Sequence, residues 1–237
     1  MRVTQLWRYP VKSMQGERLE AATIADRGIV GDRHWAIVNL TTGLTLTARR
    51  EPRLLFAQAH FVDPDTVQIT LPDGQVATSN EQLSAWLGHD AELRRAVTPE
   101  PGTFEIALDF EHEDTADWMT WEGPVGSFHD SGKTQVSLAS EATFRDWEER
   151  RFRINVIVDG SGEDDLVGRQ LRLGEVTLDV TKPIDRCVMT TRPQPGGIER
   201  NLDVLRTINA ERGGMLGIGT LVVTGGEVRV GDEVVAA

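Results

Sequence analysis

Short apolar segments separated by glycine and proline constrain this fold more than any other feature of the sequence. The chain has 237 residues, with 23 glycines and 10 prolines spread along it. Across residues 176–180 apolar side chains alternate with polar ones, which is typical of a strand with one buried face. We therefore expect a mainly β protein with a few helices, whose C-terminal half is an antiparallel barrel or sandwich.

The same patterns place the individual elements. Besides residues 176–180, strands are predicted over residues 3–9, 35–39, 67–71, 153–158, 171–173 and 221–223. Two glycines within residues 224–227 predict a tight hairpin that joins residues 220–223 to residues 228–230. A helix is expected over residues 80–87, where Ser79 and Gln82 have capping-box spacing. A second is expected after Ser140, whose hydroxyl can cap backbone amides, and a third over residues 201–210.

The stretch from residue 99 to residue 121 is acidic, polar and weakly periodic. Such a composition is typical of a linker or an insertion. We place a domain boundary near Val97, which divides the chain into domains of residues 1–97 and 98–237.

Charge and cysteine content exclude several classes of protein. The formal net charge of -12 argues against binding to nucleic acid, which relies on clustered lysines and arginines. No apolar run approaches the roughly 20 residues needed to cross a bilayer, so no membrane association is expected. The single cysteine forms no internal disulfide and no all-cysteine metal site, which fits a reducing cytoplasm.

That cysteine, Cys187, follows the alternating strand within residues 182–191. Pro183 is expected to stop regular strand pairing and to leave Cys187 at a loop edge, where functional residues are common. The neighbouring Lys182, Arg186 and Arg192 favour a thiolate, the form that binds metals and acts as a nucleophile. The alternative is that Cys187 is a small buried hydrophobic residue.

A second candidate cluster consists of Lys12, Ser13 and Arg33. An ammonium, a hydroxyl and a guanidinium suit the oxygens of a phosphate. The alternative is a solvated lysine and an arginine paired with Asp26 or Asp32. The five histidines are scattered and are interpreted as structural, whereas Trp118 and Trp121 could shape the mouth of a pocket.

Five segments in the same order resemble the MOSC family, which is named for the C-terminal domain of molybdenum cofactor sulfurase. They are YPVKS (9–13), GDRHWAIV (31–38), SLASEA (137–142), RFRINVIV (151–158) and RCVMTT (186–191). Within this family the chain is most similar to the branch of the amidoxime-reducing component. The resemblance implies a MOSC-type β-barrel and a smaller N-terminal β-barrel-like α+β domain.

The resemblance also implies a molybdenum–molybdopterin cofactor. Cys187 would be both the catalytic residue and the protein ligand of the metal, which a soft sulfur donor suits. The residues that match cofactor-binding positions of the family are Lys12, Ser13, Arg33, Asp130, Ser131, Arg153, Asn155, Arg186, Thr190 and Thr191. Asp185 or Asp130 could relay protons, or could be a structural carboxylate paired with a neighbouring arginine.

The implied reaction is the two-electron reduction of a small N-hydroxylated substrate. Because the chain has no cysteines for an iron–sulfur cluster, electrons are expected from a separate ferredoxin, flavoprotein or cytochrome. The mitochondrial member of the branch has a membrane anchor, whereas Met1 here leads into the first predicted strand, so a soluble cytoplasmic protein is expected. Two other hypotheses stay open: a sulfur carrier with a persulfide on Cys187, and a non-catalytic protein that binds the cofactor.

Overall fold

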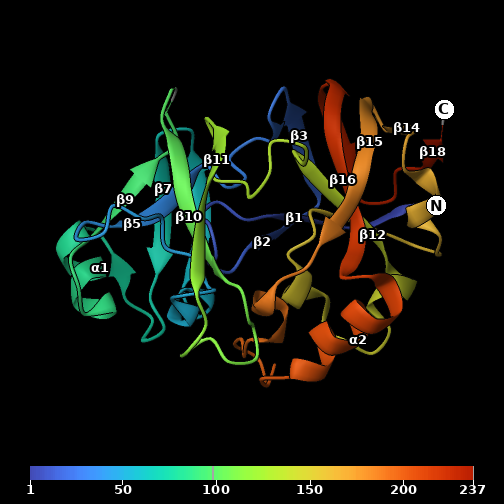
Figure 1. The fold of residues 1–237 in the computed structure, drawn as a ribbon. Coiled ribbons are helices and arrows are strands. Elements are labelled where there is room, and N and C mark those ends of the chain that lie inside the picture. The colour runs from blue at the N-terminus through green and yellow to red at the C-terminus, as the bar shows by residue number, and fades with distance from the viewer. Residues whose placement is uncertain (98, 237) are drawn as a thin grey trace.

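The computed structural model describes residues 1–97 and 99–236 and is mostly β, as the sequence predicts (Figure 1). Its largest sheet has eight strands in the order β18-β14-β15-β16-β12-β13-β1-β2. These strands are β1 (Val3–Arg8), β2 (Glu17–Leu19), β12 (Val136–Ser140), β13 (Val156–Val158), β14 (Gln170–Leu173), β15 (Val176–Asp185), β16 (Met215–Thr224) and β18 (Val234–Ala236). All neighbours pair antiparallel except β12 and β13, which are parallel.

Smaller sheets complete the β structure. The sheet β17-β3-β4 is formed by β3 (Ala21–Ala25), β4 (Gly28–Ile29) and β17 (Gly226–Arg229). The pair β5-β9 and the sheet β6-β7-β8 are formed by β5 (Trp35–Asn39), β6 (Gln58–Asp63), β7 (Thr66–Thr70), β8 (Val76–Ala77) and β9 (Ala91–Arg95). A two-stranded hairpin is formed by β10 (Pro101–Ala107) and β11 (Trp118–Val125).

Two of the predicted helices are confirmed. Helix α1 (Asn80–Leu87) ends at Gly88 in the left-handed conformation, and α2 (Leu202–Arg212) begins at Asn201, whose side chain accepts a hydrogen bond from the amide of Asp203. Ser79 makes no side-chain capping bond, and Gln82 accepts a hydrogen bond from the amide of Thr78. Among the described residues, no helix is long and apolar enough to span a bilayer.

The helix predicted after Ser140 is only a short 3-10 helix, η2 (Glu141–Phe144). Ser140 does not cap it, because the hydroxyl donates to the buried carboxylate of Glu163 at 2.6 Å. The other 3-10 helices are η1 (Pro52–Phe56), η3 (Glu149–Phe152), η4 (Glu163–Leu166) and η5 (Val188–Thr191).

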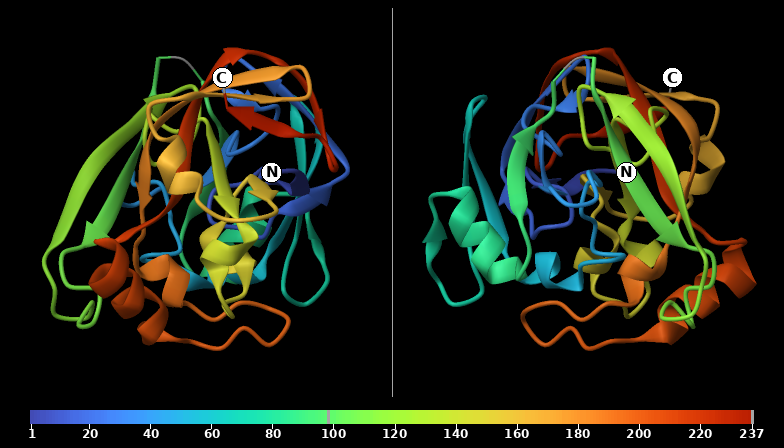
Figure 2. Two further views of the ribbon diagram at one scale, coloured as in Figure 1. Left: turned by 90° about the vertical axis from the view of Figure 1, so that its right-hand side faces the viewer. Right: turned by 60° about the vertical axis from the view of Figure 1, so that its left-hand side comes forward.

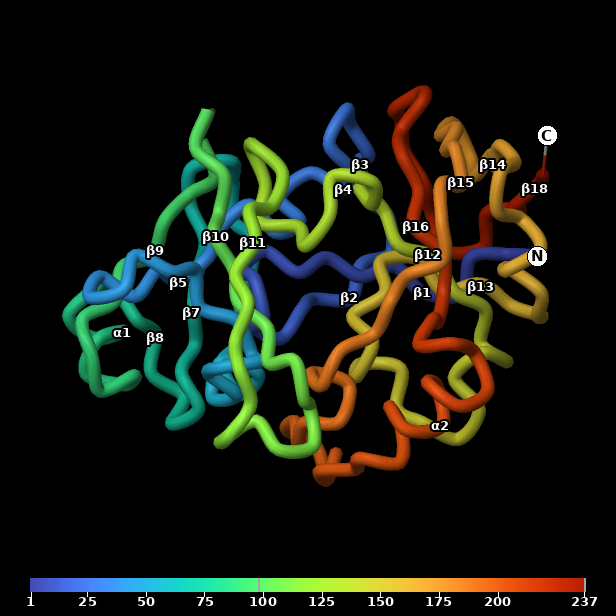
Figure 3. The backbone as a smooth tube through the Cα atoms, viewed as in Figure 1, coloured from blue at the N-terminus to red at the C-terminus, as the bar shows by residue number. Residues whose placement is uncertain are grey.

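The two ends of the chain share one hydrophobic core. Leu6 and Ile24 from the N-terminal strands pack with Val156, Leu178 and Ile218 from the second half, and both termini lie on the same side of the molecule (Figures 1 and 3). A second core is formed within residues 11–91 beneath α1. The first strands therefore fold with the C-terminal half, while the predicted boundary near Val97 stays a prediction.

The hairpin predicted around residues 224–227 is wrong. β16 pairs with β12 and β15, whereas β17 pairs with β3 from the N-terminal region. The glycines do supply a change of direction, and Gly226 has a φ of +159°. The turn thus carries the chain from one sheet into another, which a local pattern of turn residues cannot distinguish from a hairpin.

The acidic stretch is also more ordered than a linker. Most of it lies in the β10–β11 hairpin, which is paired from Pro101↔Val125 to Ala107↔Trp118 and lies on the outside of the molecule, at the left-hand edge of the left view of Figure 2 (Figures 1 and 2). Its apolar residues are few but well placed, since Phe104 is fully buried against Ala36 and Phe128. Weak periodicity therefore concealed a strand pair that buries only one face.

Pro183 does not stop the pairing of β15. The strand continues to Asp185, with Pro183 opposite Ile218, although the register shifts on both sides of the proline. The segment predicted as a strand over residues 153–158 is shorter and begins at Val156, because Arg153 has a positive φ of 52°. Both irregularities lie where the chain reaches the pocket described next.

Candidate functional site

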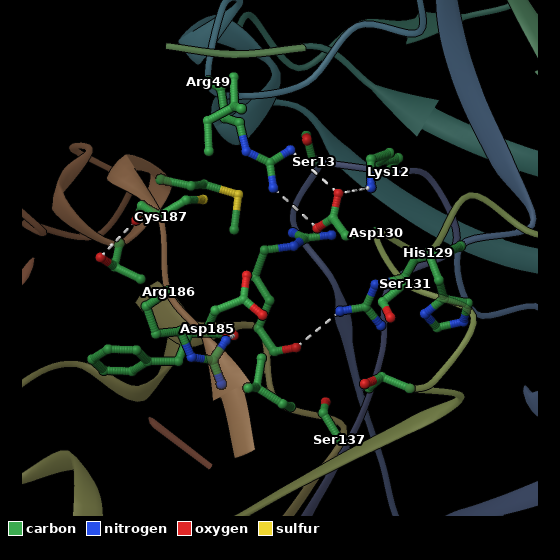
Figure 4. Close-up of a pocket in the computed structure, with 18 of the residues that line it drawn as sticks. Lys12, Ser13, Arg49, His129, Asp130, Ser131, Ser137, Asp185, Arg186 and Cys187 are labelled. Atoms are coloured by element: carbon green, nitrogen blue, oxygen red, sulfur yellow. Dashed lines mark hydrogen bonds and ion pairs between the residues drawn. The ribbon is translucent and has the colours of Figure 1, made fainter. Parts of the chain in front are cut away.

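A cavity of about 440 Å³ lies between β15 with its following loop and the loops of the N-terminal region (Figure 4). Its volume is that of a typical small-molecule site. Nine of the ten predicted cofactor-binding residues line it together with Cys187; they are Lys12, Ser13, Arg33, Asp130, Ser131, Arg153, Asn155, Arg186 and Thr190. Thr191 does not, because it is fully buried and its hydroxyl donates to the carbonyl of Val188 at 2.8 Å.

Cys187 lies two residues after the end of β15 and immediately before η5. Its backbone is extended, its side chain is partly exposed in the pocket, and its carbonyl accepts the hydroxyl of Thr190 at 3.0 Å. The 3-10 turn thus fixes the backbone on the C-terminal side of the sulfur. Cys187 is not the fully buried hydrophobic residue of the alternative interpretation.

Opposite Cys187 lies a cluster that holds Asp130 between two cations (Figure 4). Asp130 accepts from Lys12 Nζ at 2.9 Å and from Arg49 Nη1 at 3.2 Å. Its side chain lines the pocket and is 51% exposed. Desolvation raises the pKa of Asp130, but Arg49 and Lys12 outweigh this effect and hold the pKa well below its ordinary value.

The pKa values of Lys12 and Arg49 shift in opposite directions. Burial lowers the pKa of Lys12 to about 8, although the neighbouring Asp130 carboxylate acts to raise it. Burial also disfavours the Arg49 cation, but Asp130 and then Cys187 outweigh it and raise the pKa of Arg49. Arg49 therefore stays charged beside the sulfur, although no sequence motif drew attention to it.

Ser13, Arg33 and Arg153 share an unusual backbone conformation. Of the described non-glycine residues, four have a positive φ, and these three line the pocket. Such conformations cost about 1 kcal/mol or more and gather at functional sites. Contacts across the pocket maintain them: Ser13 accepts the amide of Ala48 at 3.0 Å, and Arg33 donates to the carbonyl of Arg153 at 3.0 Å.

Arg33 also forms the ion pair with Asp32 that the alternative interpretation predicted. This pairing does not remove Arg33 from the pocket, since the guanidinium reaches Asn155 Oδ1 at 3.4 Å. Asn155 is held in turn by the hydroxyl of Ser137 at 2.8 Å.

Arg153 and Arg186 are cations with no carboxylate partner among residues 1–97 and 99–236. Arg186 donates to the carbonyls of Leu216 and Phe152 at 2.6–2.9 Å, and Arg153 to that of Met14. Burial lowers the pKa of each to about 10. The Nη2 atom of Arg153 is buried without a hydrogen-bond partner.

Several lining residues were not predicted, and others differ from their prediction. His129, interpreted as structural, lines the pocket, and burial together with Arg33 lowers its pKa to about 4. Asp185 pairs with Lys182 at 3.1 Å and not with an arginine. Trp121 lines the pocket but Trp118 does not. Apolar residues that the sequence did not single out are Ile106, Met119, Phe152, Ile184 and Met189.

The donor set fits an anionic cofactor that brings its own metal ligands. Two uncompensated guanidiniums and an unpartnered buried donor suit a phosphate or a polar ring edge. In the described part of the chain no three His, Cys, Asp or Glu side chains converge, so a bare metal ion would find one sulfur ligand, Cys187, and little else. A metal carried on an organic ligand agrees with both observations.

Comparison with protein families accounts for almost the whole chain. The MOSC N-terminal beta barrel domain matches residues 1–120, and the MOSC domain matches residues 126–235. The protein belongs to the MOSC family.

Relatives in that family include the molybdenum cofactor sulfurase of Drosophila grimshawi, at 27% identity over 92% of this chain but only 31% of that protein. The mitochondrial amidoxime-reducing component 1 of Mus musculus is 24% identical over 89% of this chain and 71% of that protein. This chain thus spans under a third of the sulfurase. Among solved structures, the YuaD protein from Bacillus subtilis has a TM-score of 0.45 and 12% identity, covering 98% of this chain and 93% of that one.

Proposed function

We propose that this protein binds the molybdenum–molybdopterin cofactor, with Cys187 as the protein ligand of the metal, and reduces N-hydroxylated compounds with electrons from a separate donor. The observation that carries the proposal is the convergence of one partly exposed cysteine and two uncompensated arginines in a single pocket. The likeness to the mitochondrial amidoxime-reducing component, of which this chain covers 71%, supports the choice of reaction.

Different residues of the pocket would bind different parts of the cofactor. Arg153 and Arg186 would neutralise the anionic cofactor, and the Nη2 of Arg153, which has no hydrogen-bond partner among the described residues, would be available as a donor to it. Lys12, Ser13, Arg33 and Asn155 provide donors and acceptors for a polar ring edge. Asp130 holds Lys12 and Arg49 in place and, with its low pKa, stays ionised near neutral pH, so it acts as an ion-pair partner and not as a proton donor.

The cofactor, when bound, supplies the redox chemistry. For an N-hydroxyamidine, two electrons and two protons convert the N–OH group into N–H and release water. The single cysteine of the chain is committed to the metal, so the electrons come from a separate protein of ferredoxin, flavoprotein or cytochrome type. A reducing, cytoplasmic compartment would keep Cys187 as a thiol.

The test is turnover of cofactor-loaded protein with a chemical reductant such as reduced methyl viologen. We expect viologen oxidation on addition of an N-hydroxyamidine, and none with Cys187→Ser. Bound molybdenum and pterin without turnover would instead support a cofactor-binding protein. Cyanide-releasable sulfur on Cys187 in molybdenum-free protein would support the sulfur carrier, the function for which the likeness to the sulfurase is the specific observation.

A further inference from the structure

The β10–β11 hairpin presents an apolar face to the pocket. Directly opposed residues of an antiparallel pair point to the same side, and the pairs Phe104↔Trp121 and Ile106↔Met119 alternate along the strands with polar pairs such as Glu105↔Thr120. Phe104 is buried, whereas Ile106, Met119 and Trp121 line the pocket. The inner face of the hairpin is therefore one wall of the site.

This wall differs in chemistry from the rest of the lining. Much of the lining is made of charged and amide side chains, whereas Ile106 and Met119 line the pocket together with Ile184 and Met189 of the segment that carries Cys187. Met119 is 53% exposed, and Met189 lies two residues after the cysteine. Apolar side chains from two separate segments therefore line the pocket that also contains Cys187.

Side-chain contacts join the hairpin to the rest of the protein at two places. Midway along β11, Trp121 Nε1 donates to the carbonyl of Asp130 at 3.2 Å. At its tip Glu113 pairs with Arg192 at 2.7 Å and Glu111 pairs with Arg206 of α2 at 2.8 Å. These contacts hold the hairpin against the rest of the protein, while the flexible side chain of Met119 can adapt to a ligand.

We propose that Ile106 and Met119 are specificity-determining residues that bind the apolar substituent of the substrate, so that the substrates are N-hydroxylated compounds carrying an aryl or branched alkyl group next to the N–OH. This inference rests on the proposed function for the reaction itself. A charged substituent would lie unpaired against these aliphatic side chains, which is costly, whereas a ring would bury apolar area on both partners.

The test compares two N-hydroxyamidines, one with a phenyl and one with a methyl substituent, on cofactor-loaded protein with reduced methyl viologen. We expect kcat/KM to favour the phenyl compound by about tenfold or more, and Ile106→Thr/Met119→Gln to reduce that ratio at least about fivefold. Met119→Leu should keep the ratio. Thr120→Gln, an exposed change on the outer face of the same strand, is the matched control and should also keep it.

A ratio near one in the native protein, or an equal loss on both compounds in the double variant, would overturn the proposal. If neither compound is reduced, the proposed reaction fails, and calorimetric binding of the phenyl and methyl carboxamides, which lack the N–OH, tests the wall separately. Tighter binding of the phenyl carboxamide that is lost in the double variant supports an apolar subsite, and equal binding rules it out.

Discussion

Several residues at the pocket are buried or have a backbone conformation in a way that is unfavourable for the stability of the fold. Lys12, Arg153 and His129 are buried with their charged forms disfavoured, and three pocket residues have a positive φ. Stability is thus traded for a cationic, preorganised cavity, as is common at ligand sites. An anionic ligand would recover part of that free energy.

His129 makes the cofactor-free protein acid-sensitive. Burial, followed by Arg33, lowers its pKa from 6.5 to about 4, so between these values the unfolded chain binds a proton that the folded chain does not. The free energy of unfolding therefore falls as the pH drops from about 6.5 to 4, by up to about 3 kcal/mol from this group. Urea unfolding of the native protein and His129→Leu across this range should show a shallower loss in the variant. Parallel curves would contradict the assignment.

Most of the pocket lining was predictable from the family motifs, while the binding roles of these residues stay a prediction. Nine of ten predicted cofactor-binding residues line one pocket, because the motif segments meet in space. Arg49 was missed because it lies in a loop without a motif, and its role depends on the approach of Asp130 from residues far along the chain. The prediction that Thr191 lines the pocket is wrong, because the 3-10 turn after Cys187 directs its hydroxyl to the carbonyl of Val188.

At the scale of elements, the helices with strong local sequence patterns were predicted correctly, whereas strand pairing depends on residues far apart in the chain. Helices α1 and α2 lie where the sequence predicts them, although the Ser79 cap that was expected for α1 is not formed. The turn at residues 224–227 was misassigned because β17 finds its partner in β3, about two hundred residues earlier along the chain. The β10–β11 hairpin was missed because its outer face is as polar as a linker.

The tip of that hairpin depends on the pair between Glu113 and Arg192, whose side chains are 15% and 13% exposed. Removing one partner leaves a mostly buried charge unpaired, so Glu113→Gln should lower the free energy of unfolding by about 2 kcal/mol. Limited proteolysis should also cut faster within residues 108–117. Glu122→Gln, an exposed change on β11, is the control. If both variants lose the same free energy of unfolding, the pair between Glu113 and Arg192 does not hold the tip of the hairpin.

At the scale of the whole molecule, the site exists because the two ends of the chain fold together. β1 pairs with β2 on one side and with β13 on the other (Figure 3). Lys12 and Ser13, which follow β1, line the same pocket as Cys187 (Figure 4), and Arg33 lines it as well. The net charge of -12 gave no hint of a cationic pocket, because local convergence is independent of the overall balance. The mainly β class was predictable, whereas the strand order was not.

The most direct test of the central claim is the molybdenum and pterin content of the native protein and of Cys187→Ser, both produced in a host that makes the cofactor. We expect nearly one molybdenum and one pterin per native chain, and a clear loss of molybdenum in the folded variant. Native protein that is well folded yet carries neither, or a variant that keeps its molybdenum in full, would contradict the assignment of Cys187 as the metal ligand.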